Sequence, residues 1–157
     1  MMRRQGDPAS AWDRAAFVPA LVQLVHSIQS QVPGVSVILM APPPVVPPTA
    51  SANGFDATII REQVPDSIAV AVRTLGGNAA GRCAPGRVLL LSMQHAWPGC
   101  QSHSADTADT AGCAKYVQND GVHSTVAGAN AMADVAFGLL EQTARHCWQH
   151  KESSLEL

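Results

Sequence analysis

Apolar residues along this chain fall into three helical stripes and two short continuous runs. The first stripe lies within residues 13–31 and has the i, i+3, i+4, i+7 spacing of a helix with one buried face: Phe17, Ala20, Leu21, Leu24, Val25 and Ile28. The second stripe covers residues 60–75: Ile60, Val64, Ile68, Ala71, Val72 and Leu75. The third stripe belongs to a last helix that ends near residues 145–150: Ala129, Met132, Ala133, Ala136, Phe137 and Leu140. Pro65 suits only the first turn of a helix, so the firm part of the second helix begins there.

The two continuous apolar runs predict β-strands. Residues 35–40 and 88–93 are short and apolar at nearly every position, which is typical of parallel strands covered on both faces. Pro33 and Gly34 end the first helix before the first run. Residues 41–58 contain five prolines and predict a stiff loop at the carboxyl end of the first strand, and a long polar loop follows the second strand.

The predicted order is helix, strand, helix, strand, helix. This alternation indicates an α/β fold with a parallel sheet and right-handed crossovers. Its length of 157 residues suits one domain over residues 1–150, with residues 151–157 as a frayed tail. Two doubly covered strands do not make a whole sheet. We therefore expect the C-terminal part of a larger domain, or a sheet completed by a partner chain or a homo-oligomer.

Charge and hydropathy exclude two kinds of partner. Ten Lys and Arg against twelve Asp and Glu give a net charge of -2, and no basic run is present, so nucleic acid is not an expected partner. No apolar run approaches the roughly 20 residues of a membrane span. The first ten residues include charged side chains, but no apolar segment follows them, so no signal peptide is expected. Neither compartment nor oligomeric state follows from the composition.

Four cysteines fit no Cys-x-x-Cys pattern: Cys83, Cys100, Cys113 and Cys147. They are plain thiols in a reducing compartment, whereas in an oxidising one Cys100 and Cys113 would close the polar loop between them as a disulfide. A zinc site built from His95, His103 and these two cysteines matches no structural zinc spacing, so no metal site is predicted.

Residues 116–135, YVQNDGVHSTVAGANAMADV, place an acid three residues before a histidine at a turn that runs into the last helix. Asp120 and His123 are the types used as an orienting acid and a general base. Taken alone, the same residues are also a simple turn in which Ser124 or Thr125 caps the helix. The choice between these interpretations depends on the rest of the chain.

Three segments together resemble the C-terminal half of the SGNH (GDSL-type) hydrolases: VILMAPPP, VLLLSM and NDGVHSTVAGANAMADVAFGLL. That family has a three-layer α/β/α, flavodoxin-like fold with a parallel sheet. Its last block is Asp-x-x-His, a small polar residue, a glycine and a helix, and this sequence matches it at five positions: Asp120, His123, Ser124, Thr125 and Gly128. The resemblance implies that His123 takes the proton of a nucleophilic serine and that Asp120 orients the imidazole.

The sequence departs from the family in its first half. The Gly-Asp-Ser strand that carries the nucleophile has no counterpart. Residues 3–14 stand in place of the family's Gly-x-Asn-Asp block, with Asp7 at the acid position but Gly6 at the position of the oxyanion-binding asparagine. Ser10 is not a substitute nucleophile, because no strand precedes it to hold its hydroxyl at a sheet edge. Ser10 is instead interpreted as a residue at the entry of the first helix.

The leading hypothesis is therefore an SGNH-type ester hydrolase domain that lacks its serine block. The complete enzyme would hydrolyse a small-molecule carboxylic ester, such as an acyl or acetyl group on a sugar, through an acyl-enzyme and without a metal or cofactor. The alternative is a non-catalytic α/β module that pairs its sheet edge with a partner chain.

Overall fold

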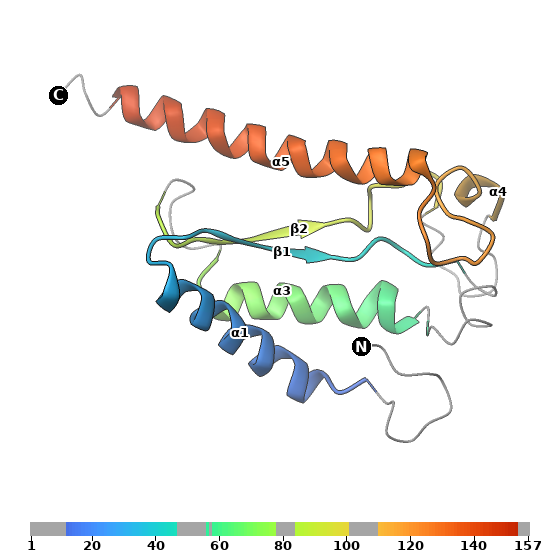
Figure 1. Ribbon diagram of the computed structural model, residues 1–157, viewed down its shortest axis with the longest axis horizontal. Helices are drawn as coiled ribbons and strands as arrows, with labels where there is room; N and C mark the ends of the chain where they lie inside the picture. Colours follow the sequence, from blue (N-terminus) through green and yellow to red (C-terminus); the bar gives the residue numbers. More distant parts are fainter. Residues whose placement is uncertain (1–11, 47–55, 57, 78–83, 101–109, 154–157) are drawn as a thin grey trace.

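The computed structural model describes residues 12–46, 56, 58–77, 84–100 and 110–153, and its sheet has two parallel strands in that part of the chain (Figure 1). Strand β1 spans Val37–Ala41 and strand β2 spans Val88–Ser92. Their register runs from Val37 opposite Val88 to Ala41 opposite Ser92. Both strands lie within two residues of the predicted runs at either end, so the prediction of a parallel pair is confirmed.

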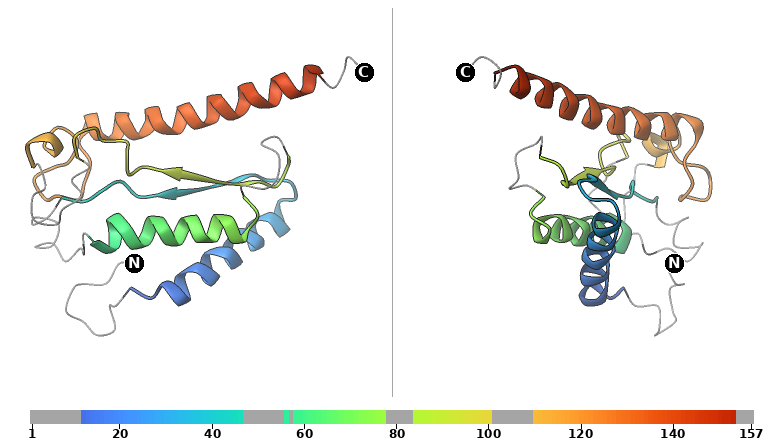
Figure 2. Two further views of the ribbon diagram at one scale, coloured as in Figure 1. Left: turned by 180° about the vertical axis from the view of Figure 1, so that it is seen from behind. Right: turned by 60° about the vertical axis from the view of Figure 1, so that its left-hand side comes forward.

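Helices lie on both sides of this pair. Figure 1 shows α5 (Val126–Ser153) along one face, and α1 (Arg14–Gln31) and α3 (Val64–Thr74) along the other. The view from behind in Figure 2 shows the same arrangement. Two short elements complete the order: a π-helical turn, η2 (Ile59–Gln63), before α3, and α4 (Thr110–Cys113) before α5. The chain thus has the predicted mixed α/β character.

The first helix begins at a side-chain cap. Asp13 has an extended backbone, and its carboxylate accepts a hydrogen bond from Ala16 N at 3.1 Å. The helix ends at Gln31, two residues before Pro33, and Gly34 turns the chain with a φ of 81°. The predicted helix over residues 13–31 is confirmed, with Asp13 as its cap.

The second predicted helix is divided at Pro65. Val64 N donates to Ile59 O, five residues back, and Pro65 has no N–H to continue the ladder of η2. The α-helix then starts at Val64 with proline in its first turn, as the sequence indicates. The residues before it form a π-turn rather than α-helix, and this turn keeps Ile60 buried.

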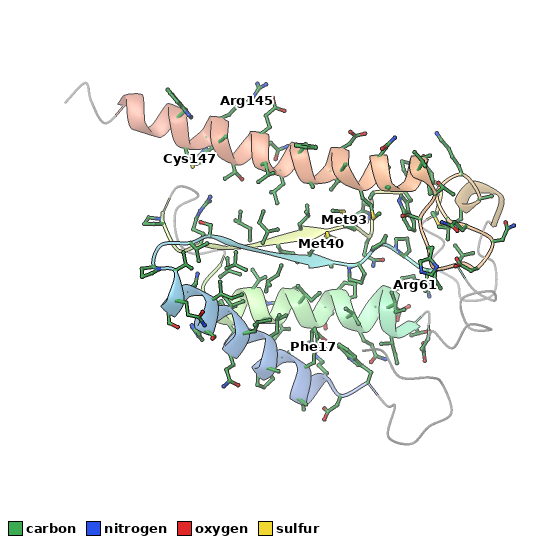
Figure 3. The ribbon with its side chains drawn as sticks, in the orientation of Figure 1. Phe17, Met40, Arg61, Met93, Arg145 and Cys147 are labelled. Carbon is green, nitrogen blue, oxygen red and sulfur yellow. A yellow bond between two sulfur atoms is a disulfide. The ribbon has the colours of Figure 1, made fainter. Side chains whose placement is uncertain are left out.

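Two hydrophobic clusters fill the two faces of the sheet. The cluster on the α1 and α3 face has Val25, Ala41, Val64, Ile68, Val72 and Val88 buried at its centre. Figure 3 shows Phe17 between α1 and α3, where it contributes to this cluster. The second cluster surrounds the carboxyl end of β2 and the start of α5: Val46, Leu91, Met93, Ala96, Trp97, Cys100, Cys113 and Val117. The candidate catalytic turn lies beside this second cluster.

The last helix is longer than predicted. Its last described residue is Ser153, so residues 151–153, expected in the frayed tail, are helical. No proline or glycine interrupts the sequence after Gly138, which explains why the helix continues. Among the described helices, none is long and apolar enough to cross a membrane.

Candidate functional site

Asp120 and His123 lie on a short closed turn between α4 and α5. Val117 and Ser124 form an antiparallel bridge at the base of the turn, and Gln118 N donates to His123 O at 2.8 Å. Gly121 adopts a φ of 74°, which glycine accepts without strain. The turn follows the carboxyl end of the sheet, the edge where α/β proteins place their sites (Figure 1).

The turn is also joined to the loop that leaves β1. Val46 N donates to Gly121 O at 2.9 Å, and Val122 packs against the buried pair Val45 and Ile60. Residues 42–46 of the predicted proline loop thus support the turn, whereas residues 47–55 and 57 lie outside the described part of the chain.

The acid and the histidine are in direct contact. Oδ2 of Asp120 lies against Nδ1 of His123, and Oδ1 accepts hydrogen bonds from Val122 N and His123 N, both at 3.0 Å. With Nδ1–H donating to the carboxylate, Nε2 is left as the proton acceptor. The His123 side chain is 73% exposed, so Nε2 is accessible to a group outside the turn.

These hydrogen bonds lower the pKa of the Asp120 carboxyl from 3.8 to about 2, with the His123 side chain as the largest cause and the N–H groups of Val122 and His123 next. A lowered pKa in the folded state stabilises the fold at pH values above 3.8. This stabilisation is lost as the pH falls from 3.8 towards 2. The carboxylate is therefore ionised throughout the neutral range, as an orienting acid requires.

Replacing His123 with alanine is expected to raise the pKa of Asp120 towards 3.8, because its strongest hydrogen bond is lost. The pKa should remain below 3.8, since the two backbone N–H donors are retained. Carbon-13 NMR titration of the Asp120 carboxyl measures this directly. The matched control is His95→Ala, which removes an exposed histidine outside the turn. An unchanged Asp120 midpoint in His123→Ala would show that the pair does not interact in solution.

Thr125 and Gly128 fix the start of α5 against the turn. The helix begins at Val126, so Thr125 is the cap: its hydroxyl accepts from Gly128 N at 3.1 Å and donates to Lys115 O at 2.6 Å. A Cβ at position 128 would lie 2.1 Å from Tyr116 O, so only glycine fits there. The predicted cap and the glycine of the family-like block therefore have a structural explanation of their own.

Trp97 anchors the same junction from β2. Its side chain is 0% exposed, its Nε1 donates to Gly128 O at 3.0 Å, and its ring stacks parallel to Tyr116. No local pattern around Trp97 could have revealed a hydrogen bond to a residue so distant in the sequence.

Cys100 and Cys113 form a disulfide, so the plain-thiol interpretation is wrong for this pair. Both cysteines are buried beside Trp97, and Cys113 O accepts hydrogen bonds from Tyr116 N and Val117 N. The bond therefore ties the loop after β2 to the segment that enters the turn. Cys147 is also disulfide-bonded.

The remaining predicted candidates do not join the turn. The zinc alternative loses both thiolates to the disulfide, and the described residues contain no group of three potential metal ligands. His95 is exposed after β2, and within the described part of the chain the hydrogen bonds of the His123 ring lead to Asp120 and to no serine. Gly6, Asp7, Ser10 and His103 lie outside the described residues.

Comparison with known proteins adds no relative: no family model, no curated protein and no solved structure matches this chain. Function is therefore inferred from the geometry of the Asp120–His123 turn and from the sequence resemblance.

Proposed function

We propose that this chain provides the acid–base pair of a serine ester hydrolase of the SGNH type, on a three-layer, flavodoxin-like α/β/α arrangement. The observation that carries the proposal is the contact between Asp120 and Nδ1 of His123 on a rigid turn, with the histidine ring exposed. An ionised carboxylate behind an accessible imidazole is the arrangement that a general base requires.

The proposed chemistry is acyl transfer. A serine Oγ–H gives its proton to Nε2 of His123 as Oγ bonds to the ester carbonyl carbon. The imidazolium, stabilised by Asp120, then returns the proton to the alcohol oxygen as the carbon–oxygen bond breaks. Water hydrolyses the acyl-serine by the same two proton transfers. The nucleophile is expected from a Gly-Asp-Ser segment outside these 157 residues.

Hydrolysis of p-nitrophenyl acetate by the purified chain tests the acid–base function. This activated ester needs only a base or an imidazole nucleophile, so His123 should accelerate it without the serine. His123→Ala is expected to reduce the chain-dependent rate by at least about tenfold, within the range of general-base catalysis. His95→Ala, another exposed histidine, should have little effect.

A fluorophosphonate probe followed by intact-mass measurement locates any nucleophile in the same samples. We expect no serine adduct on the chain alone. An adduct that disappears in His123→Ala would show that this chain contains its own serine. A well-folded chain without His123-dependent hydrolysis would refute the acid–base function.

A second candidate function is a module that pairs its sheet edge with a partner chain. It is favoured by the exposure of two β1 side chains: Ile38 is 37% exposed and Met40 is 55% exposed. Apolar side chains on a short strand are normally covered.

A further inference from the structure

The outer edge of β1 presents backbone groups without a strand partner in the described part of the chain. In a parallel ladder, alternate residues direct both N–H and C=O to the same neighbour. Val37 N donates to Arg87 O and Ala41 O accepts from Met93 N, so the odd-numbered positions of β1 face β2. The N–H and C=O groups of Ile38 and Met40 therefore point to the outer edge. The same two residues have the exposed side chains.

Helix α1 lies beyond this edge rather than beneath the two strands. It packs against α3, and α3 is the helix that packs on both β1 and β2. Neighbouring helices are about 8–10 Å apart and neighbouring strands about 4.8 Å apart. Because α1 leads directly into β1, it lies on the β1 side of α3, below the position of the next strand outward (Figure 2). Three apolar side chains there are at least one-third exposed: Leu24, Ile28 and Val32.

Helix α5 presents an apolar flank towards the same position. On one side of its buried stripe lie Ala133 and Leu140, and the other side carries Gln142. Leu140 is 49% exposed, whereas Phe137, which is 69% exposed, lies with Glu141 on the face of α5 turned away from the sheet. Since α5 runs antiparallel to the strands (Figure 1), the right-handed turn of the helix directs the apolar flank to the β1 side. Figure 3 shows the Met40 side chain on the α5 face of the sheet.

We propose that the outer edge of β1 is the docking site for a β-strand of another polypeptide, parallel to β1 and apolar on both faces. The edge supplies hydrogen bonds, α1 would cover one face of the added strand, and α5 would cover the other. Strands covered on both faces are apolar and normally parallel. Strand addition of this kind draws affinity from main-chain bonds and specificity from side-chain pockets.

A second copy of this chain does not fit the edge. A symmetric pair would place the two-fold axis midway between the two β1 strands, about 2.4 Å from each. Such a pair would be antiparallel, whereas strands covered on both faces are normally parallel. The occupant is therefore a strand of a different polypeptide.

Arg87 adds a charge preference near the amino end of the site. It precedes β2, one strand in from the outer edge of β1, and by strand alternation it lies on the same face as Leu91, the face covered by α5. The residue is only 9% exposed, and its Nε and Nη1 are buried without a hydrogen-bond acceptor among the described residues. A buried guanidinium needs acceptors. We expect a carboxylate near the amino end of the added strand.

Amide hydrogen exchange with a synthetic strand tests the proposal. The probe is the heptapeptide Glu-Val-Ile-Val-Leu-Val-Lys, N-methylated on alternate amides so that one edge can pair and the peptide cannot self-associate. Saturating peptide should slow exchange at the amides of Ile38 and Met40 by at least about tenfold, because they gain partners. The Leu39 amide, which faces β2, should change less. The peptide methylated on every amide should have no effect, and a Gln replacement of its Glu should bind more weakly.

Variants of the chain separate strand pairing from non-specific adhesion. Ile38→Pro removes one outward N–H, which an edge strand tolerates, and should abolish protection at Met40. Leu140→Lys changes an exposed side chain and should weaken peptide binding at least about tenfold, whereas Gln142→Lys on the opposite flank of α5 should not. Unchanged exchange at Ile38 and Met40 would refute the proposal. Equal binding of the fully methylated peptide, or equal binding to the Leu140→Lys chain, would also refute it. The readout is binding, so its failure leaves the ester-hydrolysis test unaffected.

Discussion

Replacing Trp97 with alanine is expected to lower the free energy of unfolding by about 3–5 kcal/mol, which makes it the most destabilising single change that we predict. The side chain is 0% exposed at the centre of the cluster beside the Asp120–His123 turn. Its removal leaves a cavity, ends the parallel stack on Tyr116 and leaves the carbonyl of Gly128 without its indole donor. Urea denaturation followed by circular dichroism measures the change.

Two further variants determine what Trp97 contributes. Trp148→Ala removes a tryptophan that is 72% exposed and should change stability by no more than about 0.5 kcal/mol. Trp97→Phe keeps most of the apolar volume but not the N–H, so it should cost less than Trp97→Ala. Equal losses for Trp97→Ala and Trp148→Ala would contradict the packing described for this junction.

Removing the disulfide between Cys100 and Cys113 is expected to cost about 3 kcal/mol. The bond closes a loop with a sequence separation of 13, and a loop near that length restricts the unfolded chain by about that much. Alanine is the appropriate replacement at both positions, because both cysteines are buried and serine hydroxyls would add a desolvation cost. The double variant Cys100→Ala, Cys113→Ala is compared with the wild type by urea denaturation.

Reductant provides an internal check on that measurement. Added to the wild-type chain, reductant should lower the free energy of unfolding at least as much as the double substitution does. The reason is that it also opens the disulfide of Cys147. If the double variant unfolds at the wild-type midpoint, the loop is held by packing around Trp97 and not by the covalent bond.

Much of the fold follows from the spacing of apolar residues along the chain. Where the structure differs from the predicted elements, the cause is local and physical. The apolar runs at 35–40 and 88–93 predict both strands, because continuous apolar character needs cover on both faces. The π-turn of η2 was not predicted, since it depends on which carbonyl receives the Val64 N–H next to Pro65. The four residues of α4 lie in a segment whose composition predicts a polar loop. No helical spacing of apolar residues marks them.

The candidate site was only partly predictable. The spacing of Asp120 and His123 brings their side chains together because the turn closes between them, which is a local property. The disulfide could be proposed from the sequence but not decided, since it depends on how closely the fold brings Cys100 to Cys113. The Trp97 bond to Gly128 joins the loop after β2 to α5 and has no local signal. The catalytic role of the pair and the nature of its substrate remain proposals.

The closed turn around Asp120 also has a consequence for the order of folding. Its own hydrogen bonds join residues a few positions apart, such as Gln118 with His123 and Thr125 with Tyr116. The parallel pair of β1 and β2 forms only after the whole crossover through α3 has been closed. Local contacts form in microseconds, whereas distant pairings are slower because the loop entropy is lost first. The acid–histidine geometry can therefore be established while the sheet is still assembling.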